Sequence, residues 1–220
     1  MTAIKRVLCT KCLRPQRTCI CAWITPTEHN VEVLFLQHPL EIDNAKGSAR
    51  LLHLSLARSQ IISGEVFAED KLRGLLYAPF PHQQDTDQKQ KTILPLLLYP
   101  STAEDRNIAT PPALLLPAGS AAIQYRLVVL DGTWRKSRKM LYLNPLLQQL
   151  PRLPLSDPPA SHYRIRKAHK PDQLSTYEAT CYALMQLENE AEKYLPLLAA
   201  FDGFVEQISR YDPNSKESEI

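Results

Sequence analysis

Glycine is scarce in this chain, and its loops are rich in proline instead. Only 6 of the 220 residues are glycine, whereas 18 are proline, so the loops are expected to be stiff. Neither a GxGxxG nor a GxxxxGK[ST] pattern occurs, although most dinucleotide and triphosphate loops depend on one of them. The sequence therefore argues against a glycine-rich phosphate cradle.

Long hydrophobic runs are also absent. No stretch reaches the roughly 20 apolar residues that span a bilayer, and no apolar core precedes a small-residue cleavage site at the N-terminus. We therefore expect a cytoplasmic protein without a membrane partner. The formal net charge is only +3, so a role in nucleic-acid binding must rest on a local basic patch.

The chain does contain enough apolar material for a sizeable core, since 44% of its residues are hydrophobic. Three strand-like runs, at residues 31–36, 92–98 and 126–130, are separated by helical or irregular connections. This pattern predicts an α/β fold with a mainly parallel sheet and flanking helices. We expect helices over about 45–63, 134–143, 175–194 and 197–209.

Four of the five cysteines lie within residues 9–21, as a CxxC pair followed by CxC. In a chain without a secretion signal, this spacing indicates a metal site rather than a disulfide framework. Four thiolates suit one structural zinc ion, and a redox pair or unliganded thiols are the alternatives. The expected ligands are Cys9, Cys12, Cys19 and Cys21. We therefore divide the chain into a zinc-binding segment at 1–25, a main domain at 26–210 and a disordered tail at 211–220.

Each strand-like run ends in a polar or aromatic exit. In open α/β sheets, ligands bind beyond the carboxyl ends of the strands, so these exits should converge on one crevice. The exits are Gln37-His38-Pro39, Tyr99-Pro100-Ser101 and Asp131-Gly132-Thr133-Trp134.

Several residues of the exits have both a catalytic and a structural interpretation. Asp131 is either a general base or orienting group, or a carboxylate that caps the next helix. Trp134 is either core, on the same helical side as Ser137 and Leu141, or a ligand contact. His38 is either a proton carrier or a hydrogen-bonded turn residue.

Two basic clusters follow. Arg135, Arg138 and Lys139 fall on the exposed side of the helix at 134–143, and Arg164, Arg166 and Lys167 come later. They form either a solvated face or a groove that tracks RNA phosphates. Directly afterwards, Ser175-x-x-Glu178 has the spacing of a capping box, which by itself explains the glutamate.

Taken in order, these motifs resemble the DTW-domain family, the tRNA-uridine aminocarboxypropyltransferases, over nearly the whole chain. The matching residues are the four cysteines with Arg14-Pro15, the three exits with Glu41, Arg138-Lys139-Met140, and Arg166-Lys167 followed by residues 175–179. The resemblance implies a SPOUT-like knotted domain. It also implies transfer of the 3-amino-3-carboxypropyl group of S-adenosylmethionine to N3 of a tRNA uridine, with release of methylthioadenosine.

The resemblance also implies roles for the site residues. Asp131 would accept the N3 proton or polarise the imide, while Tyr99 and Trp134 would pack against the donor and a backbone amide of Ser101 or Thr133 would hold its carboxylate. The implied donor-binding residues are Gln37, His38, Tyr99, Pro100, Ser101, Gly132, Thr133, Trp134, Ser175, Thr176 and Glu178. Both basic clusters would bind tRNA. The rival interpretations are a SPOUT-type RNA methyltransferase and a non-catalytic zinc-ribbon RNA-binding protein.

Overall fold

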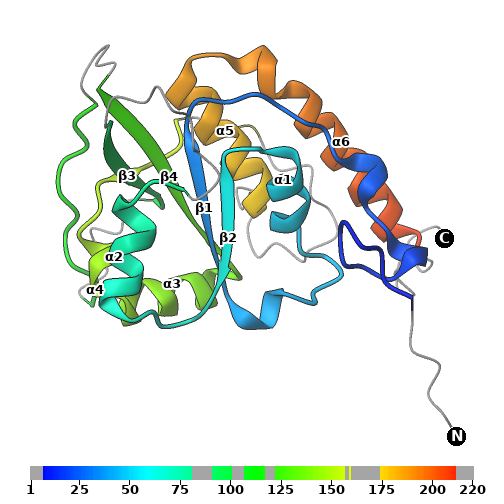
Figure 1. Ribbon diagram of the computed structural model, residues 1–220, viewed down its shortest axis with the longest axis horizontal. Helices are drawn as coiled ribbons and strands as arrows, with labels where there is room; N and C mark the ends of the chain where they lie inside the picture. Colours follow the sequence, from blue (N-terminus) through cyan, green and yellow to red (C-terminus); the bar gives the residue numbers. More distant parts are fainter. Residues whose placement is uncertain are drawn as a thin grey trace, which may run out of the picture.

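A computed structural model describes residues 7–80, 91–100, 107–116, 122–156, 159 and 174–211. Within these residues, one sheet has the strand order β2-β1-β4-β3-β5, and every neighbouring pair is parallel (Figure 1). The strands are β1 Glu32–Gln37, β2 Ser59–Ser63, β3 Thr92–Leu98, β4 Ile123–Asp131 and β5 Arg152–Leu153. The predicted mainly parallel sheet is confirmed.

The two central strands, β1 and β4, are buried on both faces. Along β1, Val33 and Phe35 join one hydrophobic cluster while Leu34 and Leu36 join the other. Residues 127–130 of β4 alternate in the same way. A strand covered on both faces has a continuous apolar run in its sequence, which is why these strands were recognisable.

Helices cover both faces of the sheet (Figure 1). One hydrophobic cluster joins the sheet to α1 Ala49–Ser55, α5 Thr176–Glu188 and α6 Ala191–Ser209. The other joins it to α2 Glu69–Tyr77, α3 Trp134–Leu143 and α4 Pro145–Gln148. The flanking helices predicted from the sequence are therefore present, in a three-layer arrangement.

The helix predicted over residues 45–63 is wrong in its second half. Helix α1 ends at Ser55, and β2 then pairs with β1 so that Phe35 lies opposite Ile61. Ile61 and Ile62 are β-branched residues that suit an edge strand, but apolar residues upstream at near-helical spacing concealed this signal. Residues 59–63 form a strand and not a helix because β1 offers them an open edge with which to pair.

The boundary between the last two helices also differs from the prediction. Helix α5 ends at Glu188 because Asn189 adopts a left-handed conformation, with φ of 53°, as is common after a helix. Helix α6 then begins at Ala191, and Pro196 lies inside it instead of preceding it.

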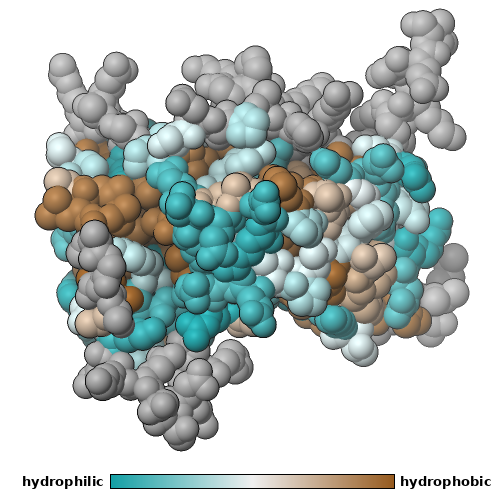
Figure 2. Space-filling view, turned by 90° about the horizontal axis from the view of Figure 1, so that it is seen from above, coloured by the Kyte–Doolittle hydropathy of each residue, from teal (hydrophilic) through white to brown (hydrophobic). Residues whose placement is uncertain are grey.

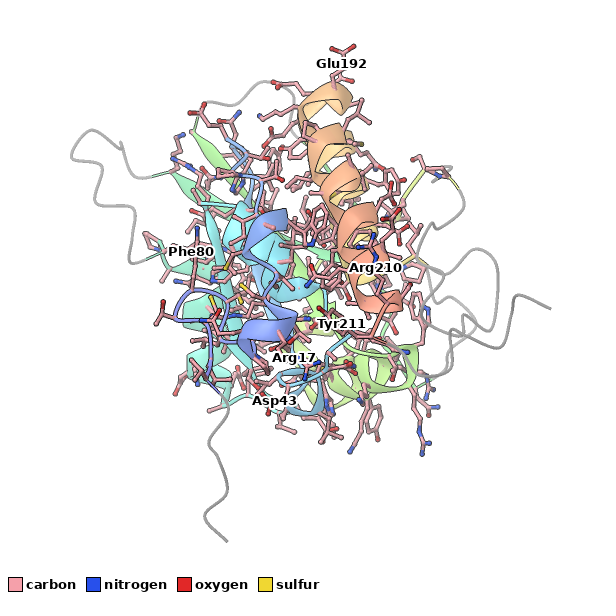
Figure 3. The ribbon with its side chains drawn as sticks, turned by 90° about the vertical axis from the view of Figure 1, so that its right-hand side faces the viewer. Arg17, Asp43, Phe80, Glu192, Arg210 and Tyr211 are labelled. Atoms are coloured by element: carbon pink, nitrogen blue, oxygen red, sulfur yellow. The ribbon has the colours of Figure 1, made fainter. Side chains whose placement is uncertain are left out.

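The cysteine segment packs on the C-terminal half of α6, as Figures 1 and 3 both show. Ile20 is fully buried, and the ring of Trp23 lies directly on Gly203, where an added Cβ would be 2.1 Å from Cζ3. Gln207 bonds both to the Trp23 indole and to the carbonyl of Cys19, the latter at 2.9 Å. The cysteine segment, residues 7–25, is therefore held on α6 by specific contacts.

A buried ion pair ties the central strands together near the end where they begin. The Arg126 guanidinium, fully buried, donates to Glu32 on β1 and to the carbonyl of Leu75, at 2.6 Å in the second case. It also stacks over the ring of Phe80 at 4.1 Å. Burial lowers the pKa of Arg126, and the neighbouring Glu32 carboxylate opposes that shift.

Figure 2 looks onto the molecule from the side where the strands begin. Hydrophilic side chains occupy the middle of this face and a hydrophobic band lies to the left. The carboxyl ends of the strands point away from this view. Among the described helices, none is both long and apolar enough to cross a membrane.

Candidate functional site

Strands β1 and β4 both run down to the lower edge of the sheet in Figure 1. Strand β4 is flanked by β1 and β3, with Gln37 opposite Asp131 and Leu98 opposite Val129. Because the three strands are parallel, their exits emerge at the same edge. The predicted emergence of the exits at one edge is confirmed for their described residues, whereas a shared crevice stays a prediction. We call residues 37–39, 99–100 and 131–134 the exit region.

The Asp131 carboxylate, only 3% exposed, is held by Gln37, whose Nε2 donates to Oδ2 at 2.8 Å. The Asp131 carbonyl accepts from the His38 amide at 2.9 Å. The α3 cap is Thr133, which accepts from the Lys136 amide at 3.4 Å. Of the two interpretations, helix capping therefore belongs to Thr133, and the carboxylate lies just before a helix N-terminus that favours negative charge.

The His38 side chain is buried and hydrogen-bonded at both ring nitrogens. Nδ1 accepts from the Leu40 amide at 3.2 Å, and Nε2 lies 3.0 Å from Glu65 Oε1. This geometry agrees with a hydrogen-bonded turn residue. The turn also packs closely on Gly132, where an added Cβ would lie 3.6 Å from the His38 Cβ and 3.1 Å from that of Lys136.

An aromatic pair forms the part of the exit region that follows β3 and β4. Trp134 is 47% exposed and meets the buried Tyr99 edge to face, with ring centroids 5.8 Å apart. The core interpretation of Trp134 is therefore wrong. Arg152, which no sequence pattern indicated, lies buried over the Tyr99 ring at 5.4 Å and donates to the Pro100 carbonyl at 3.1 Å.

Helix α3 buries Ser137, Met140 and Leu141 and exposes Arg135 and Arg138. Lys136 and Lys139 are both paired with glutamates from other elements. Sequence patterns could not indicate either pairing, because each joins residues far apart in the chain. The exposed side of α3 is therefore basic, and its lysines also tether the helix.

The first of these glutamates, Glu41, follows the β1 exit and is buried. It accepts from Lys136 Nζ at 2.7 Å and from Asn44 Nδ2 at 2.6 Å. The second, Glu65, follows β2 and accepts from Lys139 Nζ at 3.0 Å. The Lys139 ammonium first, and then His38, lower the pKa of the Glu65 carboxyl.

The capping box at the start of α5 is confirmed. Ser175 Oγ accepts from the Glu178 amide at 3.1 Å, and Glu178 Oε2 accepts from the Ser175 amide at 2.9 Å. At the far end of α5, Glu188 accepts from the amide of Val31, which precedes β1, at 2.9 Å. The helix therefore runs antiparallel to the strands, and Ser175, Thr176 and Glu178 lie towards the carboxyl ends of the sheet. The predicted residues Ser101, Arg164, Arg166 and Lys167 lie outside the described residues.

The four predicted metal ligands come together, with all four sulfur atoms within 4.8 Å of one another. Cys9 and Cys21 sulfurs are 3.6 Å apart, and those of Cys12 and Cys19 are 3.7 Å apart. A tetrahedral zinc ion with Zn–S bonds of about 2.3 Å separates its sulfur ligands by about 3.8 Å. The donor set therefore fits such an ion, whereas each of these distances is too long for a disulfide bond.

The acidity of the thiols differs within the cluster. The backbone amides of Cys12 and Lys11 lower the pKa of Cys9 to about 6. Burial, with the neighbouring thiols, raises the pKa of Cys21 to about 12. A metal ion that binds all four sulfurs would have to displace the tightly held proton of Cys21.

Two arginines fix the cysteine segment to the main domain. Arg14 donates to the carbonyls of Ala45 and Gly47, each at 2.7 Å, and Arg50 Nε donates to the Cys12 carbonyl at 2.8 Å. The cluster is therefore attached to the turn that follows Asn44.

Comparison with known proteins adds three findings. The family model of the DTW domain matches residues 6–209. The chain is 27% identical over 190 residues to tRNA-uridine aminocarboxypropyltransferase 2 of Macaca fascicularis, covering 84% of this chain and 58% of that protein. It is 29% identical over 192 residues to the Drosophila melanogaster protein of the same name, covering 86% of this chain and 69% of that protein. No solved structure matches the chain.

Proposed function

Because the chain belongs to the DTW-domain family, we propose that it is a tRNA-modifying enzyme that transfers the 3-amino-3-carboxypropyl group of S-adenosylmethionine to N3 of a tRNA uridine. The observation that carries the proposal is the family match across 6–209, together with relatives named as tRNA-uridine aminocarboxypropyltransferases. The chain spans only 58% of the macaque relative. A cytoplasmic location, where tRNA is abundant, is part of the proposal.

The reaction forms a bond from uridine N3 to the methylene of the aminocarboxypropyl arm, breaks the bond from that carbon to the sulfonium sulfur and releases methylthioadenosine. The sulfonium supplies the electrophilic carbon, and geometry decides which of its substituents reacts. The N3 proton must leave. Asp131 is the proposed acceptor or orienting group, because Gln37 already fixes one of its oxygens at the carboxyl end of β4.

The other residues of the exit region suit a co-substrate with an aromatic base and an amino-acid end. The exposed face of Trp134, braced by Tyr99, offers a surface for adenine. The Thr133 amide lies at the start of α3, and backbone amides at such a position hold carboxylates. Gln37, His38, Pro100 and Gly132 complete the proposed wall, with Ser175, Thr176 and Glu178 at its margin. Ser101, which lies outside the described residues, stays a predicted contact.

The basic side of α3 is the proposed tRNA contact. Arg135 and Arg138 are exposed beside the exit region, and a guanidinium group can bind a phosphate through two parallel hydrogen bonds. Arg164, Arg166 and Lys167 extend the proposal to residues outside the described part of the chain. The connection from β5 to α5 also crosses such residues, so the knotted topology stays a prediction.

A structural zinc ion in the cysteine segment completes the proposal. The sulfur separations support it, and the ion would hold the two cysteine pairs together. Its contribution is to the stability of the segment and not to the transfer.

Transfer of label to tRNA tests the proposed reaction. The protein is incubated with unmodified tRNA transcripts and S-adenosylmethionine labelled in the carboxyl carbon, and in parallel with S-adenosylmethionine labelled in the methyl group. Carboxyl label in tRNA is expected, and nuclease digestion should locate it in a uridine. Methyl label alone would instead indicate a methyltransferase, and binding without either label would indicate a non-catalytic RNA-binding protein.

A further inference from the structure

Glu65 lies between the exit region and the basic side of α3, and one of its oxygens contacts both. Oε1 is 3.0 Å from His38 Nε2 and 3.0 Å from Lys139 Nζ. We propose that Glu65 is a positioning residue that fixes the tautomer of His38 in the exit region and holds Lys139 until a phosphate group of RNA competes for it.

The hydrogen bonds of His38 define its protonation. Nδ1 accepts from the Leu40 amide at 3.2 Å, so that nitrogen carries no proton. Nε2 must then carry the proton and donate to Glu65. Leu40 and Glu65 therefore select the Nε2-protonated tautomer together, Leu40 by donating to Nδ1 and Glu65 by accepting from Nε2.

Glu65 is held in place from its own backbone. Asn144, buried after α3, donates to the Glu65 carbonyl at 2.9 Å and accepts from the Phe67 amide at 2.9 Å. The Glu65 side chain is 29% exposed and that of Lys139 is 59% exposed. The backbone of Glu65 is therefore fixed, and its carboxylate is less exposed than the Lys139 ammonium that it binds.

The competition for Lys139 follows from this difference in exposure. An RNA phosphate can approach the ammonium from the solvent side and must displace it from Glu65 Oε1, which keeps its bond to His38. This half of the inference rests on the proposed function, because it requires tRNA to bind along α3. The role of Glu65 in fixing the His38 tautomer does not depend on tRNA binding.

Two variants test the His38 tautomer and the competition for Lys139 separately. Glu65→Gln keeps an oxygen that can accept from His38 but removes the charge that holds Lys139, whereas Glu65→Ala removes both. In ¹⁵N spectra of the histidine side chains, His38 should stay Nε2-protonated in wild type and Glu65→Gln, and should lose part of its Nε2-protonated population in Glu65→Ala, where only the longer bond from the Leu40 amide still favours that tautomer. An unchanged His38 signal in Glu65→Ala would overturn the positioning role, provided that the amide spectrum shows a folded protein.

Binding of unmodified tRNA tests the competition. The Kd should fall about two- to fivefold in Glu65→Gln, since an exposed ion pair of this kind no longer opposes binding. In a Lys139→Met background, Glu65→Gln should leave Kd unchanged. An equal gain in both backgrounds would mean that Glu65 acts only through its general charge, and would overturn the competition.

A matched control measures that general effect. Glu69 and Arg73 form an exposed pair on α2 at 2.8 Å, and Glu69→Gln should leave both tRNA affinity and the His38 signal unchanged. If wild-type protein binds no tRNA, the proposed function and the competition both fail, whereas the His38 spectrum still decides the positioning role. If tRNA binds and only the Glu65 effects are missing, the proposed function stands and this inference falls.

Discussion

At the scale of single residues, Asp131 is the group on which the proposed chemistry depends. It is nearly buried, it accepts from Gln37, and its carbonyl holds the turn at His38. A carboxylate so placed cannot rotate freely, and its charge lies next to the positive end of α3. This rigidity suits an orienting group as well as a proton acceptor.

Substitution of Asp131 by asparagine should separate chemistry from binding. The amide of the Asp131→Asn variant would retain an oxygen for Gln37 but could not accept the uridine proton, so turnover should fall by roughly 10²-fold or more. Binding of S-adenosylmethionine, measured by calorimetry, should stay within a few fold of wild type. Asp70→Asn, on the exposed first turn of α2, should leave both unchanged. A fully active Asp131→Asn protein would place the proton acceptor elsewhere.

Glu188 should make stability depend on pH. Its side chain is 4% exposed and accepts from Lys193 Nζ at 2.6 Å as well as from two amides before β1. Burial opposes ionisation, but hydrogen bonds from Lys193 and Val31 outweigh it and lower the pKa of Glu188 below 4.5. A lowered folded-state pKa contributes stability that is present above the unfolded value and lost as pH falls through the folded one.

Glu188→Gln should therefore lower the free energy of unfolding at neutral pH, and the difference from wild type should shrink below pH 4.5. Urea unfolding at several pH values measures this. Glu192→Gln, which alters an exposed residue on the first turn of α6, should show no such trend. If the difference in the free energy of unfolding stays constant as the pH falls below 4.5, Glu188 contributes through its packing and not through its charge.

At the scale of elements, α3 is tethered on both sides. Glu41 holds Lys136 from the β1 exit, and Glu65 holds Lys139 from the segment after β2. The α3 N-terminus is thus fixed relative to these two neighbouring strands. A helix that is both basic and firmly attached can present phosphate-binding groups at a defined distance from Asp131.

The contact between the cysteine segment and α6 depends on the absence of a side chain at Gly203. An added methyl group would overlap the ring of Trp23, and such overpacking costs about 1–3 kcal/mol. The gain in helix propensity of about 1 kcal/mol offsets part of this. Gly203→Ala should therefore lower the free energy of unfolding, as measured with urea.

Gly74 on α2 is the matched control, because nothing lies within 4 Å of a Cβ at that position. Gly74→Ala should raise the free energy of unfolding by about 0.5–1 kcal/mol. A stabilised Gly203→Ala protein would contradict the tight packing of Trp23 on α6.

At the scale of the whole molecule, the cysteine segment is attached to a turn that also serves the exit region. Arg14 donates to the carbonyls of Ala45 and Gly47, while Asn44 at the start of that turn donates to Glu41. Glu41 in turn binds Lys136 on α3. A chain of contacts therefore links the cysteine segment to α3 through the turn that follows Asn44 and through Glu41.

Metal content should follow the cysteine cluster. One zinc per chain is expected, and Cys12→Ser should abolish it and lower Tm by at least about 5 °C, since metal binding contributes directly to folding. Cys181→Ala, which removes a buried thiol outside the cluster, should keep the zinc. Wild-type protein that is metal-free and unchanged in Tm by a chelator would contradict the site.

Features that depend on short-range patterns could be predicted from the amino-acid sequence. Continuous apolar runs identified the buried parallel strands, the spacing of Cys9 to Cys21 predicted the sulfur cluster, and Ser175-x-x-Glu178 predicted the start of a helix. Each pattern reflects a local rule of backbone conformation or ligand spacing, so the rest of the chain need not be known.

Contacts between residues far apart in the chain became visible only in the folded protein. Residues 59–63 form a strand because β1 offers them an open edge. Trp134 is an exposed part of the exit region instead of core because α3 turns Ser137, Met140 and Leu141 inwards. Glu65 pairs with Lys139 although the two residues are far apart in the sequence. Such contacts follow from the packing of whole elements, and the energy that selects them is distributed over the buried surface rather than encoded near either residue.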